Sequence, residues 1–150
     1  MQRSISHQNY IVTFAYIALF VIYSSLSSIY PFLPPMLAVL FALFFRALEN
    51  DDFLFTIIIA FFLVVFEANF GFILFSSIIY GYLLYKFVMP KIAQNFNCLS
   101  CGKISHVVFS YLGYYLFLNI TSAIFLTQAP DINYYIVYYI VIEFFLVSIL

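Results

Sequence analysis

Residues 134–150 read YYIVYYIVIEFFLVSIL, an apolar run that contains one charged side chain, Glu143. A helix that crosses the hydrocarbon core of a bilayer takes about 20 such residues. The rest of the chain has the same character, since 67% of its 150 residues are hydrophobic and 7% are charged. A soluble domain carries about 25% charged residues, so polar side chains are too few here to cover a globule. The sequence therefore predicts an all-α integral membrane protein that forms a single polytopic domain.

Polar breaks divide the chain into six apolar runs, which are the candidates for transmembrane helices. The runs cover residues 10–29, 32–45, 53–66, 70–89, 106–126 and 134–150. The second and third are short for a crossing. Either the second helix starts near Pro34 and continues past Arg46, or the two runs form a re-entrant pair shielded by protein or water. We favour two crossings, which gives about six transmembrane helices.

The cationic side chains decide the expected orientation. If six helices cross in turn, all five Lys and Arg residues fall on one side, namely Arg3, Arg46, Lys86, Lys91 and Lys103. The positive-inside rule then places the N-terminus and the C-terminus on the cytoplasmic side of an inner membrane. The orientation is unchanged if the short pair does not cross. Residues 91–105 form the one long polar loop of this arrangement, also on the cytoplasmic side.

A C-x-x-C pair, Cys98 and Cys101, lies in that loop, with His106 a few residues later. Such a pair is half of a zinc site or a redox pair, but a tetrahedral zinc site needs four ligands. Metal binding between two chains, redox sensing and no chemical role remain open, and thiols in the cytoplasm are reduced. We favour no chemical role, and expect no metal and no cofactor. His106 is expected at a membrane interface.

Two acidic residues have unusual positions. Glu67 ends the third run, in a polar turn near the interface, and Glu143 lies in the middle of the last run. A carboxylate at bilayer depth costs about 2.5–3.5 kcal/mol on insertion scales. Glu143 is therefore expected to be protonated, or hydrogen-bonded to Asn119, Thr121 or tyrosine hydroxyls. It could serve a proton or cation relay, but contact between helices is the interpretation that we favour.

Small residues mark expected sites of close helix packing. Ser77 and Gly81 are four residues apart in the fourth run, and Gly113 lies in the fifth. No nucleophile motif, phosphate-binding loop or paired catalytic acid is recognisable, so we expect no enzymatic activity. No basic tract suggests nucleic acid as a partner. Membrane lipid is the expected surrounding.

Residues 32–92 resemble the MreD family of bacterial rod-shape proteins. The shared pattern is a proline-led second helix, a short loop, a third helix that ends in an acid, a glycine soon after it, and a fourth helix with a late tyrosine. In this chain Pro34, Glu67, Gly71 and Tyr80 stand at these places. The family usually has Asp where this chain has Glu67. The resemblance implies a non-enzymatic partner of MreC in the cell-elongation complex, which also contains MreB filaments, RodA and a transpeptidase.

Two functions follow as hypotheses. The first is a membrane scaffold of the rod-shape complex, which acts through helix contacts and takes part in peptidoglycan synthesis without catalysing it. The alternative is a small membrane transporter or a substrate-binding transport component, which needs a polar cavity between helices. The side chains available for a cavity are Glu143, Asn119, Thr121, Ser76 and Ser77, with the tyrosines.

Overall fold

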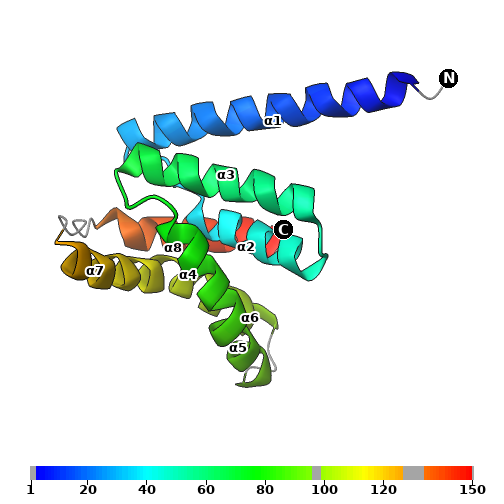
Figure 1. Ribbon diagram of the computed structural model, residues 1–150. Coiled ribbons are helices and arrows are strands. Elements are labelled where there is room, and N and C mark those ends of the chain that lie inside the picture. Colours follow the sequence, from blue (N-terminus) through cyan, green and yellow to red (C-terminus); the bar gives the residue numbers. More distant parts are fainter. Residues whose placement is uncertain (1–2, 96–98, 127–133, 150) are drawn as a thin grey trace.

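The computed structural model describes residues 3–95, 99–126 and 134–149, which are helical apart from short connections and contain no β-strand (Figure 1). The elements are α1 (Arg3–Ile29), α2 (Leu37–Glu49), α3 (Phe53–Phe70), α4 (Ser76–Leu83), η1 (Leu84–Val88), α5 (Met89–Asn95), α6 (Leu99–Val108), η2 (Phe109–Gly113), α7 (Tyr114–Phe125) and α8 (Tyr135–Ile149). The elements η1 and η2 are π-helical turns that run without a break into their α-helical neighbours. Within the described part of the chain there are therefore six continuous helices.

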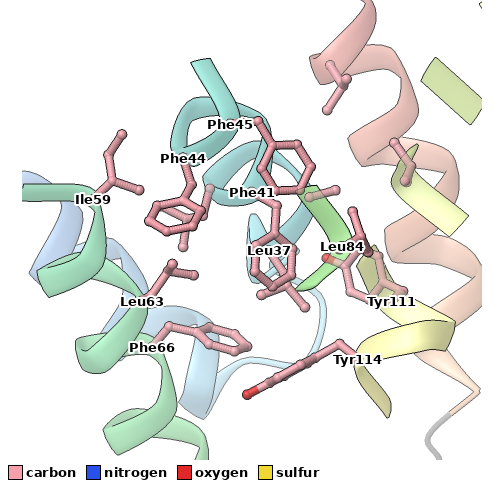
Figure 2. Packing of buried hydrophobic residues seen from close by; sticks show 14 of the residues in the cluster. Leu37, Phe41, Phe44, Phe45, Ile59, Leu63, Phe66, Leu84, Tyr111 and Tyr114 are labelled. Atoms are coloured by element: carbon pink, nitrogen blue, oxygen red, sulfur yellow. The ribbon is translucent and has the colours of Figure 1, made fainter. Parts of the chain in front are cut away.

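Helix α2 occupies the centre of the bundle. It packs against α3, α4, α6, η2 and α8, whereas α1 packs against α3 (Figure 1). The buried side chains of α2 point to both sides, toward α3 and toward the π turn η2 with α7 (Figure 2). Phe41 is fully buried and stands edge-on to the ring of Tyr114. The aromatic core thus joins the two halves of the chain through one short helix.

The third helix is longer than the sequence suggested. We expected a short run at 53–66 followed by a polar turn at 67–69, but α3 continues to Phe70 and has 18 residues. The chain turns at Gly71, whose φ of 70° is the left-handed conformation that a helix-ending glycine adopts without strain. The fourth helix accordingly begins at Ser76 and not at Phe70. The polar side chain of Glu67 does not face water. It makes the buried contacts that are described below.

The polar segment at 91–105 was expected to be a loop, and this prediction is wrong for the residues that the structure describes. Residues 91–95 continue α5, and residues 99–105 belong to α6. His106 consequently lies within a continuous helix and is 4% exposed, whereas we expected it at an interface. The second helix also starts later than expected, at Leu37 rather than at Pro34.

Two of the predicted packing residues lie at close helix contacts. A Cβ atom at Gly81 would lie 3.0 Å from the Phe41 ring, and a Cβ atom at Gly113 would lie 2.0 Å from the Tyr80 hydroxyl. That hydroxyl donates a hydrogen bond of 2.6 Å to the carbonyl of Phe109, the first residue of η2. A π turn pairs each carbonyl one residue further along than an α turn does. Gly113 therefore leaves room for α4 to approach the π turn.

Two helices are long and apolar enough to cross a membrane. They are Phe53–Phe70, with 18 residues, and Gly102–Phe125, with 24 residues. Two shorter apolar stretches accompany them, Tyr16–Ile29, which is the second part of α1, and Tyr135–Ile149, which is α8. Large hydrophobic side chains remain exposed on most of the helices, which is typical of proteins whose outer face meets lipid or a partner.

Candidate functional site

Helices α2 and α4 begin in the same unusual way. Each follows a non-helical segment and is preceded by an apolar residue in the left-handed conformation, Met36 with a φ of 58° and Phe75 with a φ of 67°. The first N–H groups of a helix have no partner within the helix and are usually met by a Ser, Thr, Asp or Asn at the N-cap. Met36 and Phe75 have no side-chain acceptor of this kind. Each helix start therefore needs an acceptor from elsewhere in the chain.

Glu143 supplies the acceptor for α2. Its carboxylate comes from α8, is fully buried, and accepts a hydrogen bond of 2.7 Å from the backbone N–H of Ala38, the second residue of α2. The other carboxylate oxygen accepts the hydroxyl of Tyr111, from η2. A negative group at a helix N-terminus also interacts favourably with the helix dipole. Glu143 thus joins α8, α2 and η2 at one point.

Glu67 does the same for α4. It is also fully buried, and its Oε2 accepts a hydrogen bond of 2.6 Å from the backbone N–H of Phe75. Its Oε1 accepts the backbone N–H of Ser77 and, at 2.9 Å, the hydroxyl of Ser76. The Ser76 hydroxyl is 2.9 Å from that of Tyr114 on α7. Both carboxylate oxygens therefore accept a main-chain N–H of the helix that they cap.

The two carboxylates are contacted by neighbouring side chains of one helix. Tyr111 binds Glu143, and Tyr114, three residues later, lies 3.5 Å from Oε1 of Glu67. Residues three apart share a face of a helix. The continuous helix α6–η2–α7 thus presents one phenol to each capped helix start, and any displacement of it affects both.

Hydroxyl groups hold the segment that precedes α2. The carbonyl of Pro31 accepts from Tyr139 on α8. The carbonyl of Leu33 accepts from Ser27 at 2.9 Å, and that of Pro34 from Tyr23 at 2.7 Å, both on α1. Three carbonyls of a proline-rich connection are in this way tied to α1 and α8. The carbonyls of Pro31, Leu33 and Pro34 are therefore met by protein hydroxyl groups.

The other sequence candidates take different places. Asn119 and Thr121 bond to carbonyls of their own helix, at Tyr115 and Phe117, and not to Glu143. A tyrosine hydroxyl is the partner that the structure gives to Glu143. Contrary to the expectation that Glu67 lies near the interface in reach of water, its carboxylate is enclosed.

His106 faces α2 from α6. Its Nε2 is 3.1 Å from the carbonyl oxygen of Ala38, so Nε2 donates the hydrogen bond. Its Nδ1 is buried without a hydrogen-bond partner within the described residues, as is Oγ of Ser77. Cys98 lies outside the described residues, as does the side chain of Cys101. The described residues contain no group of three His, Cys, Asp or Glu residues that could hold a metal ion.

Sequence reasoning expected a tyrosine partner for Glu143 without saying which one, and it missed the other hydroxyl groups that complete these contacts, namely Tyr23, Ser27, Tyr114 and Tyr139. Tyr23 and Ser27 are four residues apart on one face of α1, a spacing that the sequence displays. Their target, a stretch with three prolines, has few N–H groups and many carbonyls. Two hydroxyl groups on one face of a helix, next in sequence to a stretch rich in proline, are the signal that could have indicated this contact between α1 and the connection.

Comparison of the chain with protein-family models, with curated proteins and with solved structures gives no match. The functional argument therefore depends on the geometry of the two capped helix starts.

Proposed function

We propose that this chain is a non-enzymatic membrane scaffold that binds partner membrane proteins through its helices. In this proposal six helices cross a bacterial inner membrane and both termini lie in the cytoplasm. The observation that carries it is the use of Glu67 and Glu143. Both buried acids are engaged with backbone N–H groups of helix starts, so the polar groups that a transport pathway would need serve to hold the fold together.

Membrane insertion gives a physical reason for these caps. Helix α2 has 13 residues. At 1.5 Å per residue it is about 20 Å long, shorter than a hydrocarbon core of about 30 Å. If α2 belongs to a crossing, its start lies inside the hydrocarbon, where a free N–H or C=O costs several kcal/mol and non-helical backbone must be shielded by protein. The contacts of Glu143, Tyr23, Ser27 and Tyr139 meet that requirement.

The resemblance to the MreD family supplies the proposed partners. They are MreC-like and other membrane proteins of the cell-elongation complex, and the chain would position them during peptidoglycan synthesis without catalysing a step. The exposed apolar faces of α1 and α8 leave room for transmembrane helices of such partners. The family assignment can fail while the scaffold function stands, because the capped helix starts do not depend on it.

Partner capture tests the proposal. The full chain with an affinity tag at its C-terminus is cross-linked in native membranes, solubilised in mild detergent and purified, and the recovered proteins are identified by mass spectrometry. A polytopic protein of unrelated function with the same tag is the control. We expect cell-wall synthesis proteins to be enriched over the control. Recovery of a pair of ATPases in their place would support a transport component and contradict the scaffold.

The transport component is kept as a second candidate because of one observation. Two helices that start inside a bundle with their N-termini at buried polar groups occur in transporters, where such N-termini face anionic substrates. Here the chain's own carboxylates occupy both N-termini. Glu143→Gln separates the two functions: a large loss of activity in a protein that still assembles would favour a proton or cation relay.

A further inference from the structure

The continuous helix α6–η2–α7 contains a π turn, η2, between two α-helical parts. A π turn closes its hydrogen-bonded ring one residue later than an α turn, and it occurs mostly as a single turn within an α-helix, often at functional sites. The helix therefore holds one more residue at η2 than a regular α-helix would hold over the same rotation. This extra residue changes the direction in which the side chains of η2 point.

Hydroxyl groups of η2 and α4 bond to carbonyls at this turn. Ser110, which is fully buried in η2, donates to the carbonyl of His106 at 2.8 Å. Tyr80 on α4 donates to the carbonyl of Phe109, and Gly113 leaves the space that this approach needs. Side-chain groups that enter the hydrogen-bond ladder of a helix are a known cause of irregular helix geometry. Particular side chains of η2 and α4 therefore support the π turn.

The two phenols that reach the capped helix starts come from this part of the helix. Tyr111 is the middle residue of η2, and its hydroxyl binds Glu143 at the start of α2. Tyr114 is the first residue of α7, and its hydroxyl lies 2.9 Å from that of Ser76 at the start of α4. In a regular α-helix, residues three apart differ by about 60° around the axis. A π turn spreads one more residue over the same rotation, which widens this angle to about 110°.

We propose that η2 is a register device, which lets one helix serve both capped helix starts. Its extra residue turns Tyr111 toward Glu143, while Tyr114 keeps the place at Ser76 and Glu67 that α7 gives it. Without this residue the α6 and α7 parts would keep their packing, because the total rotation between them is unchanged. Tyr111 would turn away from Glu143 by about 50°. The cap at the start of α2 thus depends on the π turn, whereas the cap at the start of α4 does not.

Deletion of single residues tests the register device. Leu112 and Leu116 are both exposed leucines of this helix, one in η2 and the other in α7. Deletion of Leu112 removes the extra residue, so η2 becomes α-helical and the residues on both sides stay in place. Deletion of Leu116 either rotates the helix beyond it by about 100°, or uses up the π turn and rotates Tyr114. In both cases buried side chains leave the core, so deletion of Leu116 should lower the melting temperature more than deletion of Leu112.

Tyr111→Phe shows whether the π turn positions the phenol. Each variant is the full chain, purified in one detergent and unfolded by heat under circular dichroism. In the chain with Leu112, Tyr111→Phe should lower the melting temperature by about 5 °C, because a hydrogen bond to a buried carboxylate is lost. In the chain without Leu112 the same substitution should change it by less than about 1 °C, since the phenol no longer reaches Glu143. Tyr114→Phe is the control, and its effect should be the same in both chains.

Either of two results would overturn the proposal. A loss on deletion of Leu112 as large as that on deletion of Leu116 would mean that η2 contains no residue that the helix can spare. An equal effect of Tyr111→Phe in both chains would mean that the phenol reaches Glu143 without the π turn. The inference requires neither a membrane partner nor the elongation complex. Its failure would therefore leave the scaffold function standing, and recovery of a pair of ATPases in the capture experiment would leave the register device standing.

Discussion

Glu67→Gln is expected to lower the free energy of unfolding by about 2–4 kcal/mol, while Glu143→Gln costs about 1 kcal/mol or less. The reason lies in the donors that each carboxylate meets. Both oxygens of Glu67 accept a backbone N–H, one from Phe75 and one from Ser77. A carboxamide has one oxygen, so its NH₂ group must face one of these N–H groups and leave it without an acceptor.

Glu143 tolerates the same change because its Oε1 meets a hydroxyl, that of Tyr111, while its Oε2 accepts the backbone N–H of Ala38. In Glu143→Gln the amide oxygen can accept the N–H of Ala38, and the NH₂ group can donate to the Tyr111 hydroxyl, which is able to accept. The two variants are matched, since each replaces a fully buried glutamate that caps the start of another helix. Thermal unfolding of purified protein in one detergent, followed by circular dichroism, gives both melting temperatures. Equal losses in the two variants would show that the capping geometry is wrong.

Gly113→Ala is expected to destabilise the protein by about 2–3 kcal/mol, through overpacking. The added Cβ would lie 2.0 Å from the Tyr80 hydroxyl and 3.1 Å from the ring carbon that carries it. Within an exposed helix, Gly→Ala stabilises by about 1 kcal/mol because the backbone loses less entropy. The sign of the effect therefore reports whether α4 touches the π turn at this point.

Tyr80→Phe provides the control for Gly113→Ala. Alone it removes the hydrogen bond to the Phe109 carbonyl and costs about 1 kcal/mol. In combination with Gly113→Ala it removes the atom that the new methyl would strike, so the double variant should be more stable than Gly113→Ala alone. The melting temperatures of the four proteins form a double-mutant cycle. Additive losses would mean that Tyr80 and Gly113 do not meet.

The helices were largely predictable because their apolar runs are long and polar residues separate them. Each expected run coincides with a helix of the structure, although the ends differ. One error concerned residues 67–69, which were taken as a turn because Glu67 and Asn69 are polar. Gly71 carried the better signal, since a glycine with positive φ commonly ends a helix. Polarity indicates a turn only when the polar groups face water, and Glu67 faces a helix start.

The candidate site could be anticipated in part. Glu143 stands out in the sequence because a single charge interrupts an apolar run, and a tyrosine partner was among the expected ones. Its main-chain partner was not predictable, because Ala38 lies 105 positions away in the sequence. An alanine side chain also gives no sign that the backbone N–H of that residue lacks a partner within its own helix. The left-handed residues Met36 and Phe75 carry no sequence signal either, since Gly or Asn is usual in that conformation.

The two capped helix starts also explain why a chain with so few charges keeps two acids inside. Removing one partner from a buried charged contact costs about 3–5 kcal/mol. The phenols of Tyr111 and Tyr114 belong to one helix, so the two contacts constrain the same element. A scaffold benefits from such rigidity, because its partners then find their binding faces already in place.

The membrane orientation underlies the proposed function and is open to direct measurement. Intact cells that express the chain are treated with a membrane-impermeant maleimide, and a second sample is permeabilised first as a control. The native thiols of Cys98 and Cys101 report the side on which residues 98–101 lie. With Arg46, Lys86, Lys91 and Lys103 on the cytoplasmic side, the thiols should react after permeabilisation and stay unmodified in intact cells. Modification in intact cells would place this segment outside and contradict the proposed topology.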